Sequence, residues 1–205
     1  MAGIKAYYQI TISDTKTGKI IRRTHKRLSR SFVIQFLQML QCHMEHAYSG
    51  TNTHAITDTS NTSRTIGINA GTVSYHNQNH WAVDAPEDVD TYGIVVGSDN
   101  TAEANTQYTL ITKIADGTAA GQLDYGAHVW TDTQVVGANV DLQIQRPFIN
   151  NSGGNVTVEE CGIYIAAADT SATQRIFCII RDITGTVTVA DGQTLTVDYT
   201  LRTTV

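Results

Sequence analysis

Short apolar runs that recur about every ten residues dominate residues 92 to 205. Turn-forming segments rich in Gly, Asn and Asp separate them, and the whole sequence holds only two prolines, Pro86 and Pro147. This spacing is typical of antiparallel strands rather than of alternating strands and helices. It predicts a mainly β fold, an antiparallel β-sandwich of jelly-roll type. The expected strands are TYGIVV, YTLITKI, QLDYGAHVW, VDLQIQRPF, NVTVEECGIYIA, RIFCIIRD and TLTVDYTLRTTV.

The composition agrees with a β-rich fold. Charged residues make up 16% of the chain, against about 25% in ordinary soluble domains. The three cysteines are an odd number at wide spacing, which argues against a disulfide framework and fits folding in a reducing cytoplasm. We expect no membrane helix, since no apolar run approaches about 20 residues. We also expect no secretion signal in MAGIKAYYQI.

Residues 1–48 predict a basic β-hairpin followed by one amphipathic helix. AYYQITI and IIRRTH alternate as strands around a turn at Gly18. SRSFVIQFLQMLQCHM then changes to helical spacing, with apolar residues three, four and seven apart. We expect a helix over roughly residues 30–46, with this packing stripe: Phe32, Val33, Phe36, Leu37, Leu40 and Met44.

Residues 49–91 are polar and turn-rich, and they predict a long excursion before the sandwich core of residues 92–205. The three parts together are expected to make one composite domain. Within the excursion, Tyr75 and Trp81 predict an interaction surface. Such aromatic side chains serve either a protein interface or a platform that stacks a sugar.

Basic residues are concentrated at the N-terminus. Residues 1–30 hold eight basic residues and one acidic residue, a net charge of +7, whereas the other residues hold six basic and 18 acidic residues, −12. Such an arm is expected to meet an acidic neighbouring subunit, the acidic body of its own chain, or nucleic acid. We predict a salt-sensitive subunit contact that includes Arg22, Arg23, Lys26 and Arg27.

The stretch GIVVGSDNTAEANTQYTL, residues 93–110, predicts strand, tight loop and strand. The loop after Gly97 lacks the Gly-Lys-Ser/Thr ending of a phosphate loop, and no helix pattern follows it. Asp99 and Glu103 are not spaced like the ligands of a calcium loop. We expect Gly97 to relieve backbone strain at the turn, and Tyr108 and Leu110 to share one strand face.

Other side chains that could ligate a metal or catalyse a reaction are better explained by structural roles. The helical pair His43 and His46 lacks an obvious third zinc ligand. A solvated acidic turn explains DAPEDVD, the segment that holds Asp84, Glu87, Asp88 and Asp90. No nucleophile elbow occurs, and no cysteine stands in an obviously catalytic setting. We therefore predict no metal, no cofactor, no catalytic residue and no enzymatic activity.

Several motifs resemble those of small structural proteins of tailed bacteriophage particles. They are SRSFVIQFLQML, TDTSNTSRT, GIVVGSDNTAEANTQYTLITKI, DGTAAGQLDYGAHV, RPFINNSGGNVTVEECGIYI and IIRDITGTVTVADGQTLTVDYTLRTTV. Such proteins typically carry a glycine where strand meets loop, like Gly97, and a Tyr-any-Leu past it, like Tyr108 to Leu110. They also carry an Asn-Asn-Ser-Gly-Gly turn like that at 150–154, whereas Asp99 departs from their more usual second glycine. These motifs are structural, so the resemblance implies a particle component.

The resemblance implies a non-enzymatic virion protein, made in the host cytoplasm. A head decoration or cement protein that stabilises the capsid is the first expectation, and a tail, neck or adaptor protein is the second. Its partners would be other virion proteins and copies of itself, most plausibly in trimers. The alternatives outside this class are a carbohydrate-binding module that uses Trp81, Tyr75 and Trp130 for host-surface glycans, and then a glycosidase.

Overall fold

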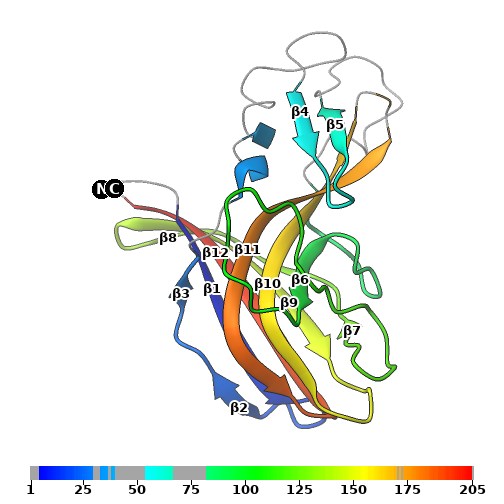
Figure 1. Cartoon of the computed structure of the whole chain (residues 1–205). Helices are drawn as coiled ribbons and strands as arrows, with labels where there is room; N and C mark the ends of the chain where they lie inside the picture. Colours follow the sequence, from blue (N-terminus) through cyan, green and yellow to red (C-terminus); the bar gives the residue numbers. More distant parts are fainter. Residues whose placement is uncertain are drawn as a thin grey trace.

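The computed structural model describes residues 5–29, 33–36, 38, 39, 54–66, 82–169, 171 and 173–204, and these parts are mainly β-structure (Figure 1). All pairings between the named strands are antiparallel, as predicted. The strands are β1 (Lys5–Asp14), β2 (Ile20–Arg23), β3 (Arg27–Leu28), β4 (His54–Thr57), β5 (Ser63–Ile66), β6 (Gly93–Gly97), β7 (Asp124–Tyr125), β8 (Val129–Val136), β9 (Asn139–Ile149), β10 (Val156–Ala168), β11 (Gln174–Val189) and β12 (Gln193–Thr204).

The larger sheet has the order β2-β1-β12-β9-β7, with β3 paired to β1 and β8 paired to β9. The N-terminal hairpin of β1 and β2 is confirmed, and Gly18 lies in its turn with a φ of 68°. One face of this sheet is buried, because alternate side chains of a strand point the same way. That buried face carries Tyr8, Ile10, Ile12, Ile144, Phe148, Leu195, Val197 and Tyr199.

The smaller sheet has the order β11-β10-β6. Figure 1 draws β10 and β11, in yellow and orange, in front of β9 and β12. Side chains of both sheets belong to one hydrophobic core, to which the smaller sheet contributes Ile94, Val95, Ile163, Ile165, Phe177 and Ile180.

Two hairpins carry the same turn, which the sequence repeats as DTSNTSR at 58–64 and DTSATQR at 169–175. Asp58 accepts hydrogen bonds from the backbone N–H groups of Ser60 and Thr62, and its other oxygen accepts one from Arg64 Nε at 2.6 Å. Asp169 binds Ser171, Thr173 and Arg175 in the same way. The β4–β5 hairpin also contacts the second turn through a bridge between Ile66 and Asp169. The predicted excursion therefore contains a small sheet with a well-defined turn.

The predicted strand YTLITKI, residues 108–114, is wrong. Residues 98–123 hold no strand, and their only β-pairing is two isolated bridges, Lys113 with Gly97 and Asp116 with Leu123. The backbone N–H of Leu110 instead donates to the Tyr164 hydroxyl at 2.6 Å, because this segment packs across β10. The connection after β6 is thus long, whereas we predicted a tight loop. The run QLDYGAHVW is likewise divided between β7 and β8.

Helical structure covers residues 34–36, 38 and 39 of the predicted helix, and Val33 before them is not helical. The other residues of the predicted helix lie outside the described residues, as do His43 and His46. Of the predicted stripe, Val33 is buried and Phe36 packs partly buried against the core, which agrees with a packing role. Met39, which is not in the stripe, is buried too. None of the helical segments described is both long and apolar enough to span a membrane.

Candidate functional site

A buried ion pair joins two neighbouring strands of the smaller sheet, the central strand β10 and the edge strand β11. Arg181 Nε of β11 lies 2.7 Å from Glu160 Oε2 of β10, and both side chains are 0% exposed. The same carboxylate accepts the backbone N–H groups of Ile111 at 3.2 Å and Thr112 at 2.8 Å. Every charge at this point is therefore matched by a donor or acceptor, as burial requires.

The terminal nitrogens of Arg181 also bind the long connection that follows β6. Its guanidinium donates to the Thr101 carbonyl at 3.0 Å and to Gln107 Oε1 at 2.9 Å, and it lies 3.9 Å from Asp99. Glu103 is used separately, as acceptor for the N–H of Ile183. The acids of the loop therefore bind the protein's own groups.

Gly97 has a different role from the predicted relief of strain, since its φ is not positive. A Cβ atom at this position would lie 2.5 Å from Glu160 Oε1 and 2.6 Å from the carbonyl oxygen of Thr112. Close approach of the connection to the buried carboxylate is thus the reason for glycine here.

A second buried arginine, Arg146 of β9, has no carboxylate within hydrogen-bond distance among the described residues. It is 0% exposed and stacks on the Tyr125 ring, 4.8 Å from the ring centre. Burial lowers its pKa to about 10, so it remains charged at neutral pH. Within the described part of the chain its guanidinium donates only to carbonyl oxygens, which belong to Pro86, Val89, Tyr92, Ile94 and Gly126.

His128 completes the packing around Arg146. Its Nε2 accepts the N–H of Ile94 at 2.8 Å, so Nδ1 carries the proton that is donated to the Ala85 carbonyl at 2.9 Å. Burial lowers the pKa of His128 to about 4, and the ring is neutral at pH 7. Gly93 is required beside it, because a Cβ there would collide with the imidazole.

We expect acidification from pH 6.5 towards pH 4 to remove up to about 3 kcal/mol of folding free energy through His128. The folded pKa lies below the unfolded value of 6.5, so the unfolded chain takes up the proton first. The contribution is complete above pH 6.5 and is lost as pH falls.

Urea unfolding of the wild type and of His128→Asn across this range measures the effect, since their difference should shrink as pH falls. The comparison cancels Asp124 and Asp198, whose pKa values burial raises and whose effect is opposite. A difference that stays constant with pH, or an NMR titration of His128 near 6.5, would contradict the assignment.

Two of the three cysteines lie in the core. Cys161 and Cys178 are free and buried, and burial raises the pKa of both thiols strongly. Cys161 Sγ lies 3.2 Å from the Tyr199 hydroxyl, which donates to Asp182 at 3.0 Å. A thiol kept protonated and away from solvent is a poor nucleophile.

The acidic side chains of the turn at residues 84–90 have different partners. Asp84 accepts the indole N–H of Trp130 at 3.0 Å, and Asp90 pairs with Lys113 at 3.0 Å. Asp88 lies with Asp116 and Asp124, whose carboxylate oxygens are within 4.8 Å of one another. Three carboxylate oxygens are too few to complete the coordination of a cation such as Ca²⁺ or Mg²⁺, which would need further ligands here. The crowding of like charges adds to burial in raising the pKa of Asp124.

The four basic residues predicted as a contact lie together on one edge of the larger sheet, in β2, β3 and the link between them. Residues 20–23 and 25–28 are exposed. Arg23 Nε donates to Thr11 Oγ1, and Arg27 donates to the Thr184 carbonyl. Ion pairs among the described residues include none of the four. Their charge is therefore available to a partner.

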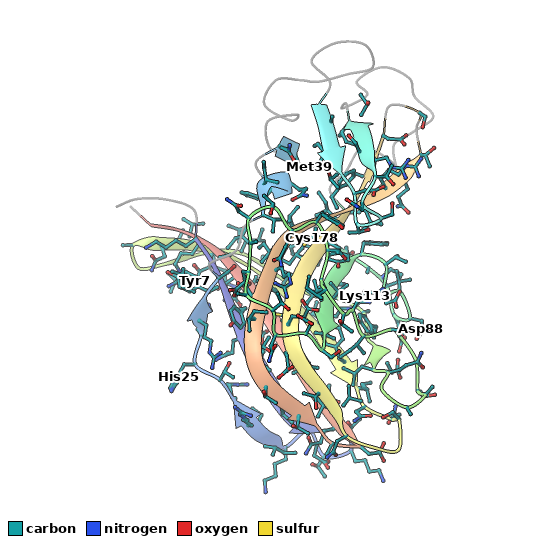
Figure 2. All side chains as sticks on the ribbon, in the orientation of Figure 1. Tyr7, His25, Met39, Asp88, Lys113 and Cys178 are labelled. Carbon is teal, nitrogen blue, oxygen red and sulfur yellow. The ribbon has the colours of Figure 1, made fainter. Side chains whose placement is uncertain are left out.

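Figure 2 shows His25, which lies between Arg23 and Lys26, on the opposite side of the molecule from Asp88 and Lys113. This separation argues against pairing of the basic edge with the acidic turn of the same chain. A cavity of about 360 Å³ beside the edge is lined by Tyr8, Arg27, Leu28, Glu103, Asp182 and Ile183. The other predicted contact residues, Tyr75 and Trp81, lie outside the described residues.

On the opposite edge of the larger sheet, only Trp130 was predicted at a surface, in the carbohydrate-binding alternative. All eight residues of β8 are exposed, including Trp130 and Val135, although the predicted strand QLDYGAHVW placed Val129 and Trp130 in the sandwich. The buried arginines were missed as well. For Arg146 a signal exists, because it alternates with Ile144 and Phe148 and so shares their inward face.

Comparisons with protein-family models, with curated proteins and with solved structures found no match to this chain.

Proposed function

We propose that this chain is a non-enzymatic structural component of a tailed-phage particle, which acts through protein–protein contacts. The observation that carries the proposal is the exposed basic edge at residues 20–28, on a chain whose net charge is −5. Its motifs also resemble those of such particle proteins. A head decoration or cement role is the first assignment, and a tail, neck or adaptor role is the second.

The buried ionisable groups favour a structural role over a catalytic one. Arg181, Glu160 and Arg146 all bind backbone groups of distant segments, and none faces solvent. These three groups hold loops rigid, and because they are buried and already hydrogen-bonded, they cannot exchange protons with a substrate. Rigidity suits a subunit whose surface must match its neighbours.

The proposed architecture is a β-sandwich with jelly-roll winding. β9 of the larger sheet leads into β10 of the smaller sheet, and β11 leads back into β12, which pairs with β9. This winding and the shared core of the two sheets support the interpretation. Proteins of this architecture commonly carry their contacts on loops and edges.

The proposed partners are other virion proteins, including the major capsid protein, and further copies of this chain, with the virion as the location. Nucleic acid is the rival partner of the basic edge. The carbohydrate-binding alternative is favoured by one observation, the 43% exposed Trp130 whose indole is fixed by Asp84. A fixed exposed indole can stack on a sugar ring.

Reversing the charge of Arg22 and Lys26 to glutamate should lower incorporation into particles by about tenfold. Neither side chain makes a hydrogen bond among the described residues, so the fold should be unaffected. Two exposed ion pairs converted to repulsion are worth about 1–2 kcal/mol together. The measurement is the copy number per purified particle, at low and at high salt.

The matched control is Lys16→Glu/Lys19→Glu, which changes the net charge equally in the neighbouring turn. Normal incorporation of Arg22→Glu/Lys26→Glu with unchanged salt sensitivity would contradict the proposed contact. Absence of the wild-type chain from particles, together with glycan binding that Trp130→Ala abolishes, would favour the carbohydrate-binding alternative.

A further inference from the structure

Strand β8 is an open edge of the larger sheet. It pairs with β9 on one side, and no other described strand pairs with it. Figure 1 shows the β8–β9 hairpin extending to one side of the two sheets. A strand in this position presents unpaired backbone N–H and C=O groups, which can continue a sheet into another chain.

The edge is also apolar. β8 begins with Val129 and Trp130 and ends with Val135 and Val136, and Val135 is 78% exposed. On β9, Val140 and Leu142 are exposed although they alternate with the buried Ile144 on the core-facing side. The core face of the sheet therefore continues onto this hairpin without cover. An uncovered apolar strip beside an open edge marks a protein contact.

The opposite edge of the same sheet is open as well, since β2 and β3 pair with no described strand other than β1. β2 and β3 are exposed and are separated by a short link, whereas β8 is interrupted by a bulge between Thr131 and Gln134. The basic edge thus offers two short strands, and β8 offers one strand of eight residues whose register with β9 shifts at the bulge. Ile20, Ile21 and Leu28 give the basic edge exposed apolar side chains of its own.

Charge distinguishes the two ways in which copies could pair. Asp132 is the only charged residue of β8 and lies near its middle. Symmetric antiparallel pairing of two β8 strands would bring two Asp132 carboxylates close together, which is unfavourable. Pairing of β8 with the basic edge would instead place Asp132 near Arg22, Arg23, Lys26 and Arg27.

We infer that β8 of one copy pairs with the β2–β3 edge of a second copy, so that the larger sheet continues from subunit to subunit. The partner is another copy of this chain, joined head to tail. Such contacts close into rings when the rotation permits. The inference rests on the proposed function in one respect, that the chain acts through protein contacts, and it names the contact surfaces.

Two exposed-site variants test the pairing by complementation. Val135→Lys places a cation in β8, and Arg22→Glu/Lys26→Glu reverses the basic edge; neither replaces a buried residue. Sedimentation velocity over a range of concentrations should show self-association of the wild type and about tenfold weaker association of each variant alone. An equimolar mixture should regain association, because the intact basic edge of the first variant meets the intact β8 of the second.

The control Ile111→Lys replaces an apolar side chain exposed elsewhere and should associate as the wild type does. Undiminished association of Arg22→Glu/Lys26→Glu, with loss only in Val135→Lys, would mean symmetric β8 pairing and would overturn the head-to-tail inference. A wild type that stays monomeric would overturn it too, as would duplex DNA binding that depends on Arg22 and Lys26.

The sedimentation measurements use the purified chain in solution, without particles. Association without incorporation into particles would therefore contradict only the proposed function, and incorporation of a strict monomer would contradict only the inference.

Discussion

Replacing Arg181 with methionine should lower the free energy of unfolding by about 3–5 kcal/mol, because it leaves the buried Glu160 carboxylate without its cation. The two groups lie 2.7 Å apart with no exposure to solvent. The variant also loses the bonds to Thr101 and Gln107, so residues 98–112 should become more sensitive to proteolysis than the sheets. Urea unfolding followed by circular dichroism, with limited proteolysis, measures both effects.

A surface arginine provides the matched control. Arg175 pairs with Asp169 at 2.7 Å but is partly exposed, and Arg175→Met should cost less than about 1 kcal/mol. The double variant Arg181→Met/Glu160→Gln should be more stable than Arg181→Met alone, since no unpaired charge remains buried. A cost below about 1 kcal/mol for Arg181→Met would show that the pair does not stabilise the connection.

Arg146→Met should destabilise the protein by at least about 3 kcal/mol, because five carbonyl oxygens lose their shared donor. No described carboxylate forms an ion pair with Arg146, so the loss reports mainly its hydrogen bonds to the backbone. Hydrogen exchange should accelerate most in residues 86–94 and near Gly126, which these bonds connect.

Arg146→Lys tests the geometry of the donor. Lysine keeps the charge, but its three donors cannot reach five acceptors spread around the planar guanidinium. We expect the free energy of unfolding of Arg146→Lys to lie between those of Arg146→Met and the wild type. Equal stability of Arg146→Lys and the wild type would mean that charge alone suffices at this site.

The strands that could be predicted are those whose alternation directly reflects burial. In β9 the buried residues Ile144, Arg146 and Phe148 stand two apart, and β1 alternates in the same way through Tyr8 and Ile10. Residues 108–114 alternate too, yet the N–H groups of residues 110–112 bind Tyr164 and Glu160, which lie about 50 positions away. A sequence pattern reports which side chains become buried, but not which distant group satisfies the backbone.

Of the candidate site, only the basic edge could be predicted from the sequence. Clustered cations are visible in the sequence, and Arg22, Arg23, Lys26 and Arg27 lie together on an exposed edge. Exposure of β8 was not predictable, because its valines resemble those of a core strand and only the extent of the covering sheet leaves them uncovered. The paired turns at Asp58 and Asp169 could have been found by comparing the sequence with itself.

Pairing of β1 with β12 along their whole length has a consequence for folding during synthesis. β1 leaves the ribosome long before β12, the neighbour that completes this side of the sheet and follows every other described strand. Contacts between segments so distant in sequence form slowly, since a long loop must close first. Until then the nascent hairpin carries a high density of like charge, which keeps it from pairing with other nascent copies. The surfaces of the larger sheet therefore reach their final arrangement only after translation has passed β12, which separates the folding of each subunit from its association with others.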